Sequence, residues 1–229
     1  LADLLRGAAP RDAGIVTSWL TGELPQGRIG IGPAAVQQAR SVPAAPAASI
    51  TVQDADTVFT RIGAVSGAGV VAARTGMLRE LFERATDAEQ DFLARLLWGE
   101  LRQGALEGVM ADAVARAADI PLADVRRAAQ LTGNLAVVAQ AALEGGAAAL
   151  RRFSLQLFRP LQPMLAAPAE DMDDALARLE EAALDYKLDG ARVQVHRSGD
   201  EVRIYTRNLN EVTASLPELV ELVRGLPAR

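Results

Sequence analysis

The 229-residue sequence contains no cysteine, which excludes disulfides, thiolate metal sites and a cysteine nucleophile. No apolar run approaches the roughly 18 residues that a membrane-spanning helix needs, and no basic-then-apolar signal segment opens the chain. Aromatic residues make up only 4% of the sequence, whereas hydrophobic residues, many of them alanine, make up 50%. We therefore expect a helix-rich, cytoplasmic protein that does not associate with membranes.

Lysine is almost absent, because 23 of the 24 basic residues are arginine and the single lysine is Lys187. A nucleophilic amine must lose its proton, and arginine effectively never does. Lys187 lies in the sequence Leu184-Asp185-Tyr186-Lys187-Leu188-Asp189-Gly190-Ala191-Arg192. The chemistry of the amine makes Lys187 a candidate nucleophile. The alternative is a solvated lysine in a turn at the end of a strand.

The net charge of −5 excludes a chain that is basic throughout. Residues 1–152 hold 15 arginines and 16 acidic residues, and residues 153–229 hold nine basic and 13 acidic residues. Any contact with nucleic acid therefore requires arginines gathered on one face, with the acidic side chains elsewhere.

Residues 1–152 show helical spacing of apolar residues and no strand-like alternation. Ser41–Ser49 is rich in Pro and Ala and predicts a loop. Asp54 or Asp56 is expected to cap the helix that follows this loop, and Thr86-Asp87-Ala88-Glu89 is a capping-box signature. We expect helices around residues 15–20, 54–62, 74–85, 87–97, 109–118, 122–131 and 134–143.

A short motif occurs twice in this helical half, 77 residues apart. Gly22-Glu23-Leu24-Pro25-Gln26-Gly27 parallels Gly99-Glu100-Leu101-Arg102-Gln103-Gly104, which predicts two structurally similar halves. Glycine-rich backbone and a helix N-terminus can approach a phosphate closely. The alternative is that these glycines only end helices in an all-helical repeat. The candidate contacts to a nucleic-acid backbone are Arg28, Gly30, Arg102 and Gly104.

The pattern changes from Phe153 onward. Arg159–Ala166 is punctuated by proline and predicts an extended segment, a short helix is expected around residues 172–183, and Tyr186–Leu188 is expected to end a strand. Apolar and polar residues alternate on both sides of Ser198-Gly199-Asp200, which predicts a β-hairpin over residues 192–206. A further helix is expected around residues 216–223. The sequence therefore predicts an α+β protein, all-helical over residues 1–152 and antiparallel α+β over residues 153–229.

The segment around Lys187 resembles the Lys-x-Asp-Gly-x-Arg motif of a nucleotidyltransferase family that contains ATP-dependent DNA ligases, RNA ligases and capping enzymes. Four residues carry the match: Lys187, Asp189, Gly190 and Arg192. The resemblance implies that Lys187 attacks the α-phosphate of a nucleoside triphosphate and releases pyrophosphate. It also implies that Asp189 orients the site near the ribose, that Gly190 permits a tight turn beside the nucleotide, and that Arg192 contacts the nucleotide or a 5′-phosphate.

Two more positions extend the resemblance. Tyr205-Thr206-Arg207-Asn208 resembles a second element of the family, in which an arginine at a strand end binds the nucleotide or the DNA 5′-phosphate. The alternative for Arg207 is a solvated arginine in a turn. Asp185 stands where the family usually has a glutamate that touches adenine, and its shorter side chain departs from that pattern. His196, the only histidine, is expected to be a surface residue on a strand.

The helical half resembles the N-terminal DNA-binding domain of multi-domain ATP-dependent DNA ligases, most clearly in Gly99–Ala105, with support from Gly22–Pro25 and Arg28–Gly32. In that family the domain has internal two-fold character and grips the minor groove on both sides of a nick. Arg159–Ala166 resembles the lead-in to the adenylation domain. The resemblance implies a monomeric ligase that uses ATP and Mg²⁺, carries AMP on Lys187, transfers it to the 5′-phosphate of nicked duplex DNA and joins the 3′-hydroxyl.

The family's later motifs, which supply a metal-binding glutamate and a base-stacking aromatic residue, have no counterpart in this sequence. We therefore expect a fragment that ends inside the adenylation domain, contains no metal ligands of its own and does not seal nicks alone. Two alternatives stay open. One is an RNA ligase or a capping enzyme that uses GTP. The other is a helical nucleic-acid- or protein-binding module in which Lys-x-Asp-Gly is incidental.

Overall fold

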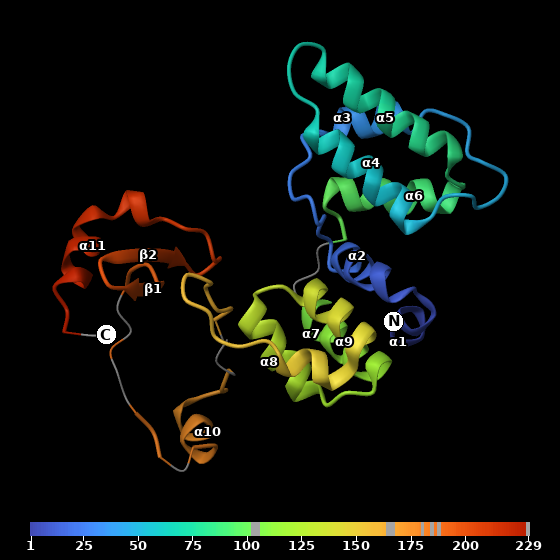
Figure 1. Ribbon diagram of the computed structural model, residues 1–229. Helices are drawn as coiled ribbons and strands as arrows, with labels where there is room; N and C mark the ends of the chain where they lie inside the picture. Colours follow the sequence, from blue (N-terminus) through green and yellow to red (C-terminus); the bar gives the residue numbers. More distant parts are fainter. Residues whose placement is uncertain (102–105, 164–167, 180, 184–185, 187–188, 228–229) are drawn as a thin grey trace. The chain divides into compact units, whose positions relative to one another are not determined.

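The computed structural model describes residues 1–101, 106–163, 168–179, 181–183, 186 and 189–227 (Figure 1). The chain divides into two compact units. The first comprises Leu1–Ala128 and Asn134–Phe153, and the second comprises Ala129–Gly133 and Ser154–Arg229. Helices build the first unit and an antiparallel hairpin lies in the second, so the predicted α+β class is confirmed.

Most helices of the N-terminal two-thirds fall at predicted places, with different ends, whereas the expected ranges do not include α1 and α3. The longest, α9, continues past the residue expected to end it and contains a break at Gly146, whose backbone is not helical. Helix α5 begins at Val70 rather than near residue 74, because its exposed first turn has no buried apolar residue that periodicity could detect. The helices are α1 (Ala2–Gly7), α2 (Pro10–Leu20), α3 (Pro33–Ala39), α4 (Val52–Ala64), α5 (Val70–Arg84), α6 (Asp87–Trp98), α7 (Leu106–Ala118), α8 (Leu122–Thr132) and α9 (Leu135–Arg151).

Capping boxes begin α4 and α6. Thr86 accepts a hydrogen bond from the Glu89 backbone, and the Glu89 carboxylate accepts one from the Thr86 N–H at 2.8 Å, as predicted. The prediction that Asp54 or Asp56 caps α4 is wrong, because the N-cap is Thr51 and Asp54 is the third helical residue. The Asp54 carboxylate accepts the Thr51 N–H at 2.9 Å. This hydrogen bond to the backbone of Thr51 lowers the pKa of Asp54.

One core of the first unit lies among α2, α3, α4, α5 and α6. Trp19 of α2 packs edge-on against Phe59, with ring centroids 5.8 Å apart, and lies 6.4 Å from the ring of Phe92. Helix α2 also packs along α9, and α1 and α9 both contact α7. Helix α2 therefore contacts both α4 and α9 (Figure 1). Side chains fully buried in this core include Val36, Phe59, Ile62, Leu78 and Phe82.

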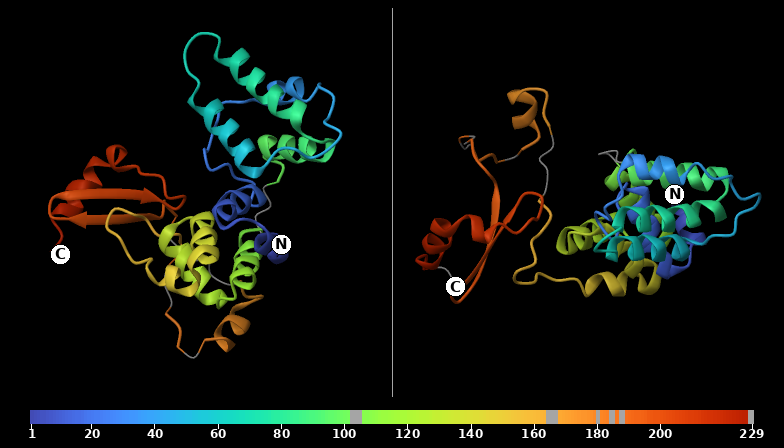
Figure 2. Two further views of the ribbon diagram at one scale, coloured as in Figure 1. Left: turned by 45° about the vertical axis from the view of Figure 1, so that its right-hand side comes forward. Right: turned by 90° about the horizontal axis from the view of Figure 1, so that it is seen from above.

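The second unit is organised around the predicted hairpin of β1 (Val193–Ser198) and β2 (Glu201–Thr206). The strands are antiparallel, and their register runs from Val193↔Thr206 to Ser198↔Glu201. Helix α11 (Pro217–Arg224) and the 3₁₀ turn η1 (Thr213–Ser215) lie against the hairpin (Figures 1 and 2). Helix α10 (Met172–Ala177) is shorter than predicted, since no buried apolar residue holds it.

The two faces of the hairpin have different partners. Val202 and Ile204 point to the face that packs against Val223 of α11. Because side chains alternate along a strand, the other face carries Gln194, His196, Arg203 and Tyr205. This face binds the segment Phe158–Leu161, which begins in a turn. The Phe158 N–H donates to His196 Nδ1 at 3.0 Å, and the His196 ring packs edge-on against Tyr205. His196 therefore lies on a strand, as predicted, but it is half-buried rather than exposed because these neighbours contact its ring.

Candidate active site and candidate nucleic-acid interface

The candidate nucleophile, Lys187, and the candidate adenine contact, Asp185, lie outside the described residues. The same holds for most of the segment expected to end a strand at Tyr186–Leu188, where the described Tyr186 has no regular structure and is exposed. The described part of the motif begins at Asp189 and continues directly into β1. What the structure places is therefore the C-terminal half of the motif.

Asp189 and Gly190 are exposed and precede β1 without regular structure. Gly190 is not among the residues with positive φ, and a Cβ built on it would meet no described atom within 4 Å. The φ angle and the open space therefore do not require glycine at this position, and the expected tight turn beside the nucleotide stays a prediction. Close approach of a nucleotide to Gly190 stays a prediction.

Arg192 and Arg207 lie at the open end of the hairpin. The last pair in its register is Val193↔Thr206. Arg192 is the residue before Val193 and Arg207 is the residue after Thr206, so both leave the sheet at the same edge. Both are exposed. The hairpin thus places two arginines that are 15 residues apart in the sequence at the same end of the sheet.

A tight turn fixes the backbone around Arg207. Thr206 N–H donates to Asn210 O at 2.9 Å, Leu209 N–H donates to Thr206 O at 2.9 Å, and Tyr205 forms a bridge with Glu211. Leu209 has a φ of 64°, an uncommon value for a side chain of this size. The turn therefore holds Arg207 on a fixed backbone and leaves its guanidinium in solvent.

Other arginines of the second unit already have partners. Arg203 pairs with Glu201 at 2.7 Å, which raises the pKa of Arg203, and it stacks 4.9 Å from the centroid of the Phe158 ring. Arg178 and Arg224 form ion pairs with acidic residues of their own helices. Arg159 and Arg197 donate to backbone carbonyls. Within the described residues of this unit, Arg192 and Arg207 are the arginines left without a hydrogen-bond or ion-pair partner, which suits them to bind an anion.

The described residues do not fit a Mg²⁺ site. Magnesium prefers an octahedral set of oxygen ligands, usually including one or two carboxylates. Across the part of the chain that the structure describes, no group of three or more His, Asp or Glu side chains is close enough together to hold a metal ion. No catalytic step is therefore assigned to a metal at these residues.

The loop between α2 and α3 presents the candidate nucleic-acid contacts Arg28 and Gly30. The Gln26 amide donates to Asp56 Oδ1 at 2.7 Å and to Thr60 Oγ1 at 2.9 Å, which ties the loop to α4. Ile29 is 4% exposed and belongs to the core, whereas Arg28 beside it is exposed. The loop is therefore held by its neighbours while Arg28 faces solvent. The paired candidates Arg102 and Gly104 lie outside the described residues.

The repeated motif ends its two helices with the same geometry. Gly22 and Gly99 have φ values of 78° and 77°. In the first copy Glu23 N–H donates to Ser18 O at 2.8 Å, and in the second Glu100 N–H donates to Arg95 O at 3.0 Å. Both are Schellman C-caps, so helix termination explains these two glycines. Similarity of the complete halves stays a prediction.

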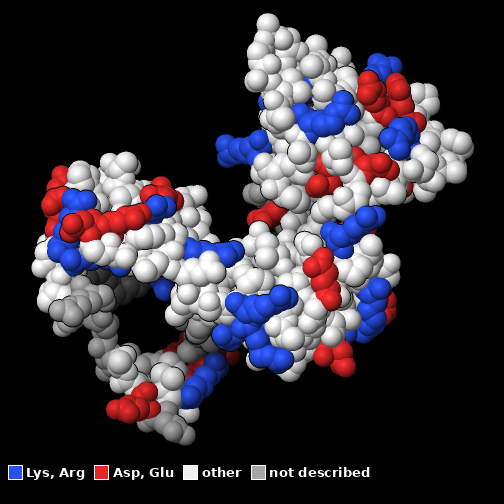
Figure 3. All heavy atoms as spheres, viewed as in Figure 1, with Lys and Arg blue, Asp and Glu red and all other residues white. Residues whose placement is uncertain are grey.

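A group of arginines on α8 and at the end of α9 was not predicted from the sequence. Arg126 and Arg127 are exposed on α8, as are Arg151 and Arg152 at the end of α9. None of the four has an acidic partner within the described residues. Figure 3 shows basic side chains gathered over α8, with both signs of charge mixed elsewhere on that face. The two adjacent Arg-Arg pairs in the sequence were the signal for this group.

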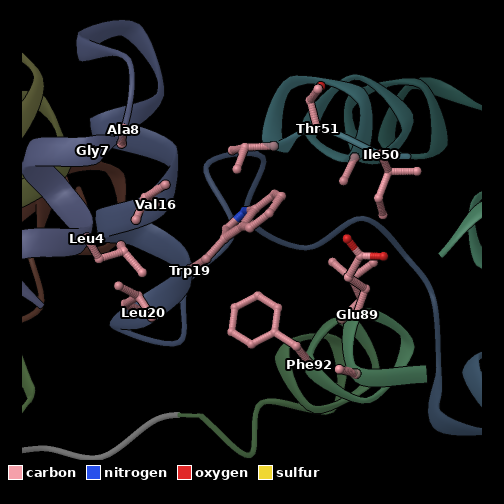
Figure 4. A pocket seen from close by; sticks show the side chains of 14 residues that line it. Leu4, Gly7, Ala8, Val16, Trp19, Leu20, Ile50, Thr51, Glu89 and Phe92 are labelled. Carbon is pink, nitrogen blue, oxygen red and sulfur yellow. The ribbon is translucent and has the colours of Figure 1, made fainter. Parts of the chain in front are cut away.

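An apolar cavity of about 530 Å³ opens beside Trp19, among residues of α1, α2, α4 and α6 (Figure 4). Its polar lining side chains include Thr51 and Glu89, which belong to the two capping boxes. No arginine lines it, and phosphate binding requires cations or free N–H donors. The cavity is therefore unsuited to a nucleotide.

Two family models match the chain. Residues 26–115 match the model described as DNA ligase N terminus, and residues 163–228 match the model described as ATP dependent DNA ligase domain. The first match contains the loop of Arg28 and Gly30, and the second contains Lys187, Arg192 and Arg207. Among the described residues, no helix combines the length and the apolar character needed to cross a membrane.

Curated relatives match along the whole chain. A Probable DNA ligase of Anaeromyxobacter sp. (strain Fw109-5) is 56% identical over 229 residues, which cover 100% of this chain and 44% of the relative. A Probable DNA ligase of Mycobacterium sp. (strain KMS) is 58% identical over 233 residues, which cover 99% of this chain and 44% of the relative. One of Sorangium cellulosum (strain So ce56) is 54% identical over 230 residues, covering 100% and 43%. The chain therefore spans less than half the length of these relatives.

Proposed function

Because the chain belongs to the ATP-dependent DNA ligase family, we propose that it supplies the DNA-binding part and the nucleophile of an enzyme that seals nicks in duplex DNA. Residues 1–152 form the DNA-binding domain, and residues 153–229 form the N-terminal part of the adenylation domain. The two family matches, 26–115 and 163–228, fall inside these ranges. The protein acts as a monomer in the cytoplasm, with nicked duplex DNA as its partner.

Lys187 is the nucleophile in this proposal. Its amine attacks the α-phosphorus of ATP, a phosphorus–nitrogen bond forms, and the bond to the bridging oxygen breaks as pyrophosphate leaves. A 5′-phosphate oxygen at the nick then displaces the lysine and takes the AMP. Attack by the 3′-hydroxyl finally forms the phosphodiester bond and releases AMP. Asp185 and Asp189 contact the nucleoside, and Gly190 lets its backbone approach.

The observation that carries this proposal is the pair of unpartnered arginines at the open end of the hairpin. Arg192 and Arg207 lie at the same end of the hairpin, and Arg192 directly follows the segment that holds Lys187. Two guanidinium groups suit an anion such as the nucleotide phosphates or the 5′-phosphate of a nick. Positive charge near an amine also favours the neutral form that can attack. Mg²⁺ would add charge neutralisation of the phosphates, through ligands other than the described residues.

Mass spectrometry of the full-length gene product tests this function. The protein is incubated with Mg²⁺ and either ATP or GTP, and the mass of the peptide that contains Lys187 is measured. We expect an AMP adduct from ATP alone, lost when nicked duplex DNA is added, and no adduct in the Lys187→Arg variant. A GMP adduct would identify a capping enzyme. The absence of any adduct would contradict a nucleotidyltransferase altogether.

A further inference from the structure

Arg74 of α5 joins three segments of the first unit through one guanidinium group. Its Nε donates to Ile62 O at 3.1 Å, its Nη2 donates to Val65 O at 2.8 Å, and its Nη1 donates to Gly30 O at 3.2 Å. Ile62 lies in the last turn of α4 and Val65 is the C-cap of that helix. The carbonyls at a helix C-terminus lack intrahelical partners and carry partial negative charge, which favours a cation there.

Gly30 fits against this guanidinium because it has no side chain. Its φ is +71°, and a Cβ built on it would lie 2.0 Å from Arg74 Nη1 and 2.9 Å from Cζ. Any other residue would have to adopt a left-handed backbone and would displace Arg74 from its carbonyl partners. Gly30 and Arg74 therefore form one structural unit, which explains the glycine without a nucleic acid present.

The residue between Arg28 and Gly30 provides a second attachment. Ile29 is buried in the core, and its Cγ2 lies 3.5 Å from the Cβ position of Gly63. The loop is therefore held at two successive residues, by apolar burial of Ile29 and by the hydrogen bond from Arg74 to Gly30 O. Arg28 comes directly before these attachments and faces solvent. The direction in which the Arg28 side chain leaves the loop therefore depends on these two attachments.

We propose that Arg74 is a positioning residue for DNA binding: it fixes the Arg28–Gly30 loop so that Arg28 meets a backbone phosphate. This inference rests on the proposed function, in which the loop contacts DNA. Three of the five N–H groups of Arg74 already donate to carbonyls, so the role proposed for Arg74 is to hold the loop rather than to bind the phosphate. Lysine cannot replace it, since a single ammonium group lacks the planar fork that reaches three acceptors.

Binding of the full-length gene product to a labelled nicked duplex over a series of salt concentrations tests this role. We expect Arg28→Gln to weaken binding by about tenfold and to lower the slope of log K against log salt by about 1. Arg74→Lys keeps the charge and should weaken binding to a similar extent. The matched control is Arg79→Gln, because Arg79 is exposed on the same helix and its ion pair is with Glu83. It should change binding by less than about twofold.

The double variant separates positioning from direct contact. If Arg74 acts through Arg28, then Arg28→Gln combined with Arg74→Lys should bind about as well as Arg28→Gln alone. Gly30→Ala, which displaces Arg74 by another route, should reproduce the loss. Hydrogen exchange should show faster exchange at Ile29 and Gly30 in Arg74→Lys, with the helices of the unit still protected.

The outcomes distinguish this inference from the function on which it rests. If Arg28→Gln weakens binding and Arg74→Lys does not, the positioning role is overturned and DNA binding by the loop stands. If the losses of binding free energy in the two single variants add up in the double variant, Arg74 contacts the DNA independently of Arg28, and the positioning role is again overturned. If the wild-type full-length protein does not bind the duplex, or if its binding is unchanged in Arg28→Gln, both the positioning role of Arg74 and DNA binding by the loop are overturned.

Discussion

Arg192 and Arg207 occupy the next positions beyond the last registered pair of the hairpin, Val193 and Thr206. Like charges at opposite positions of an antiparallel pair repel each other, so this end of the sheet is not arranged for stability. Neither arginine has an acidic partner in the described part of the chain. Two exposed arginines at this end of the sheet are explained if they bind an anion.

Replacing either arginine by glutamine should separate activity from stability. In the full-length protein, we expect Arg192→Gln and Arg207→Gln each to slow formation of the lysyl–AMP adduct by about tenfold to a hundredfold. This is the effect expected when one charge-assisted hydrogen bond is lost. The same variants should unfold at equal or slightly higher temperature, because the repulsion is removed. Rapid-quench measurement of adduct formation and thermal unfolding provide the two readouts. Arg224→Gln is the matched control, since Arg224 pairs with Glu221 within α11. An unchanged rate in Arg207→Gln would favour a solvated arginine in a turn.

The hairpin core should be the main source of stability in the second unit. Ile204 is 0% exposed and packs with Val202 and Val223. Ile204→Ala should cost about 2–5 kcal/mol of unfolding free energy. Val195→Ala on the neighbouring strand, where the side chain is 39% exposed, should cost well under half of that.

The two tryptophans make this prediction specific to one unit. Trp19 and Trp98 both lie in the first unit. Fluorescence in urea should therefore show an unchanged transition in Ile204→Ala, while hydrogen exchange of β1 and β2 becomes faster. A matching shift of the fluorescence transition would mean that the two units unfold together.

Gln194 should hold the segment Phe158–Leu161 on the hairpin. Its side chain accepts the Leu161 N–H at 2.9 Å and donates to the Leu161 carbonyl. Gln194→Leu leaves both backbone groups without these partners and should destabilise the attachment by about 1–3 kcal/mol. Gln194→Glu keeps the acceptor and should have a smaller effect. Limited chymotrypsin digestion measures the attachment, because cleavage after Phe158 should become faster in Gln194→Leu. Equal cleavage of all three proteins would show that Gln194 does not hold the segment.

Local patterns predicted the elements that depend on neighbouring residues. The capping box of Thr86 and Glu89 and the hairpin turn at Ser198–Asp200 follow from residues that are adjacent in the sequence. For the same reason, the shared open end of Arg192 and Arg207 follows once the hairpin is placed. The alternation that marks a strand fixes which residues share a face, but not what covers that face.

Contacts between distant segments could not be predicted in this way. His196 was expected at the surface because polar residues alternate with valine along β1, yet Phe158, 38 residues earlier, donates to its ring. Arg74 carries no motif, and its role depends on a carbonyl 44 residues away, at Gly30. Such partners are set by packing of whole elements, so one sequence without its structure does not identify them.

Asp54 should make the stability of the first unit depend on pH. The backbone N–H of Thr51 is the largest cause that lowers the pKa of Asp54, followed by the Thr51 hydroxyl. A carboxyl whose pKa is lower in the folded state binds a proton more tightly in the unfolded state. The contribution of Asp54 to the free energy of unfolding is therefore fully present above its ordinary pKa of 3.8. It is lost as the pH falls through the pKa of Asp54 in the folded protein.

Two variants test this origin of the pH dependence. Asp54→Asn cannot titrate, so the difference in its melting temperature from wild type should be largest at neutral pH and shrink as the pH falls below about 4. Thr51→Ala loses the hydroxyl and should cost about 1 kcal/mol at neutral pH. It keeps the backbone donor, however, and should therefore retain most of the pH dependence. Thermal unfolding followed by tryptophan fluorescence between pH 2.5 and pH 7 measures both differences. If Thr51→Ala removed the pH dependence as completely as Asp54→Asn does, the hydroxyl rather than the backbone N–H would be the group that stabilises the charged carboxylate.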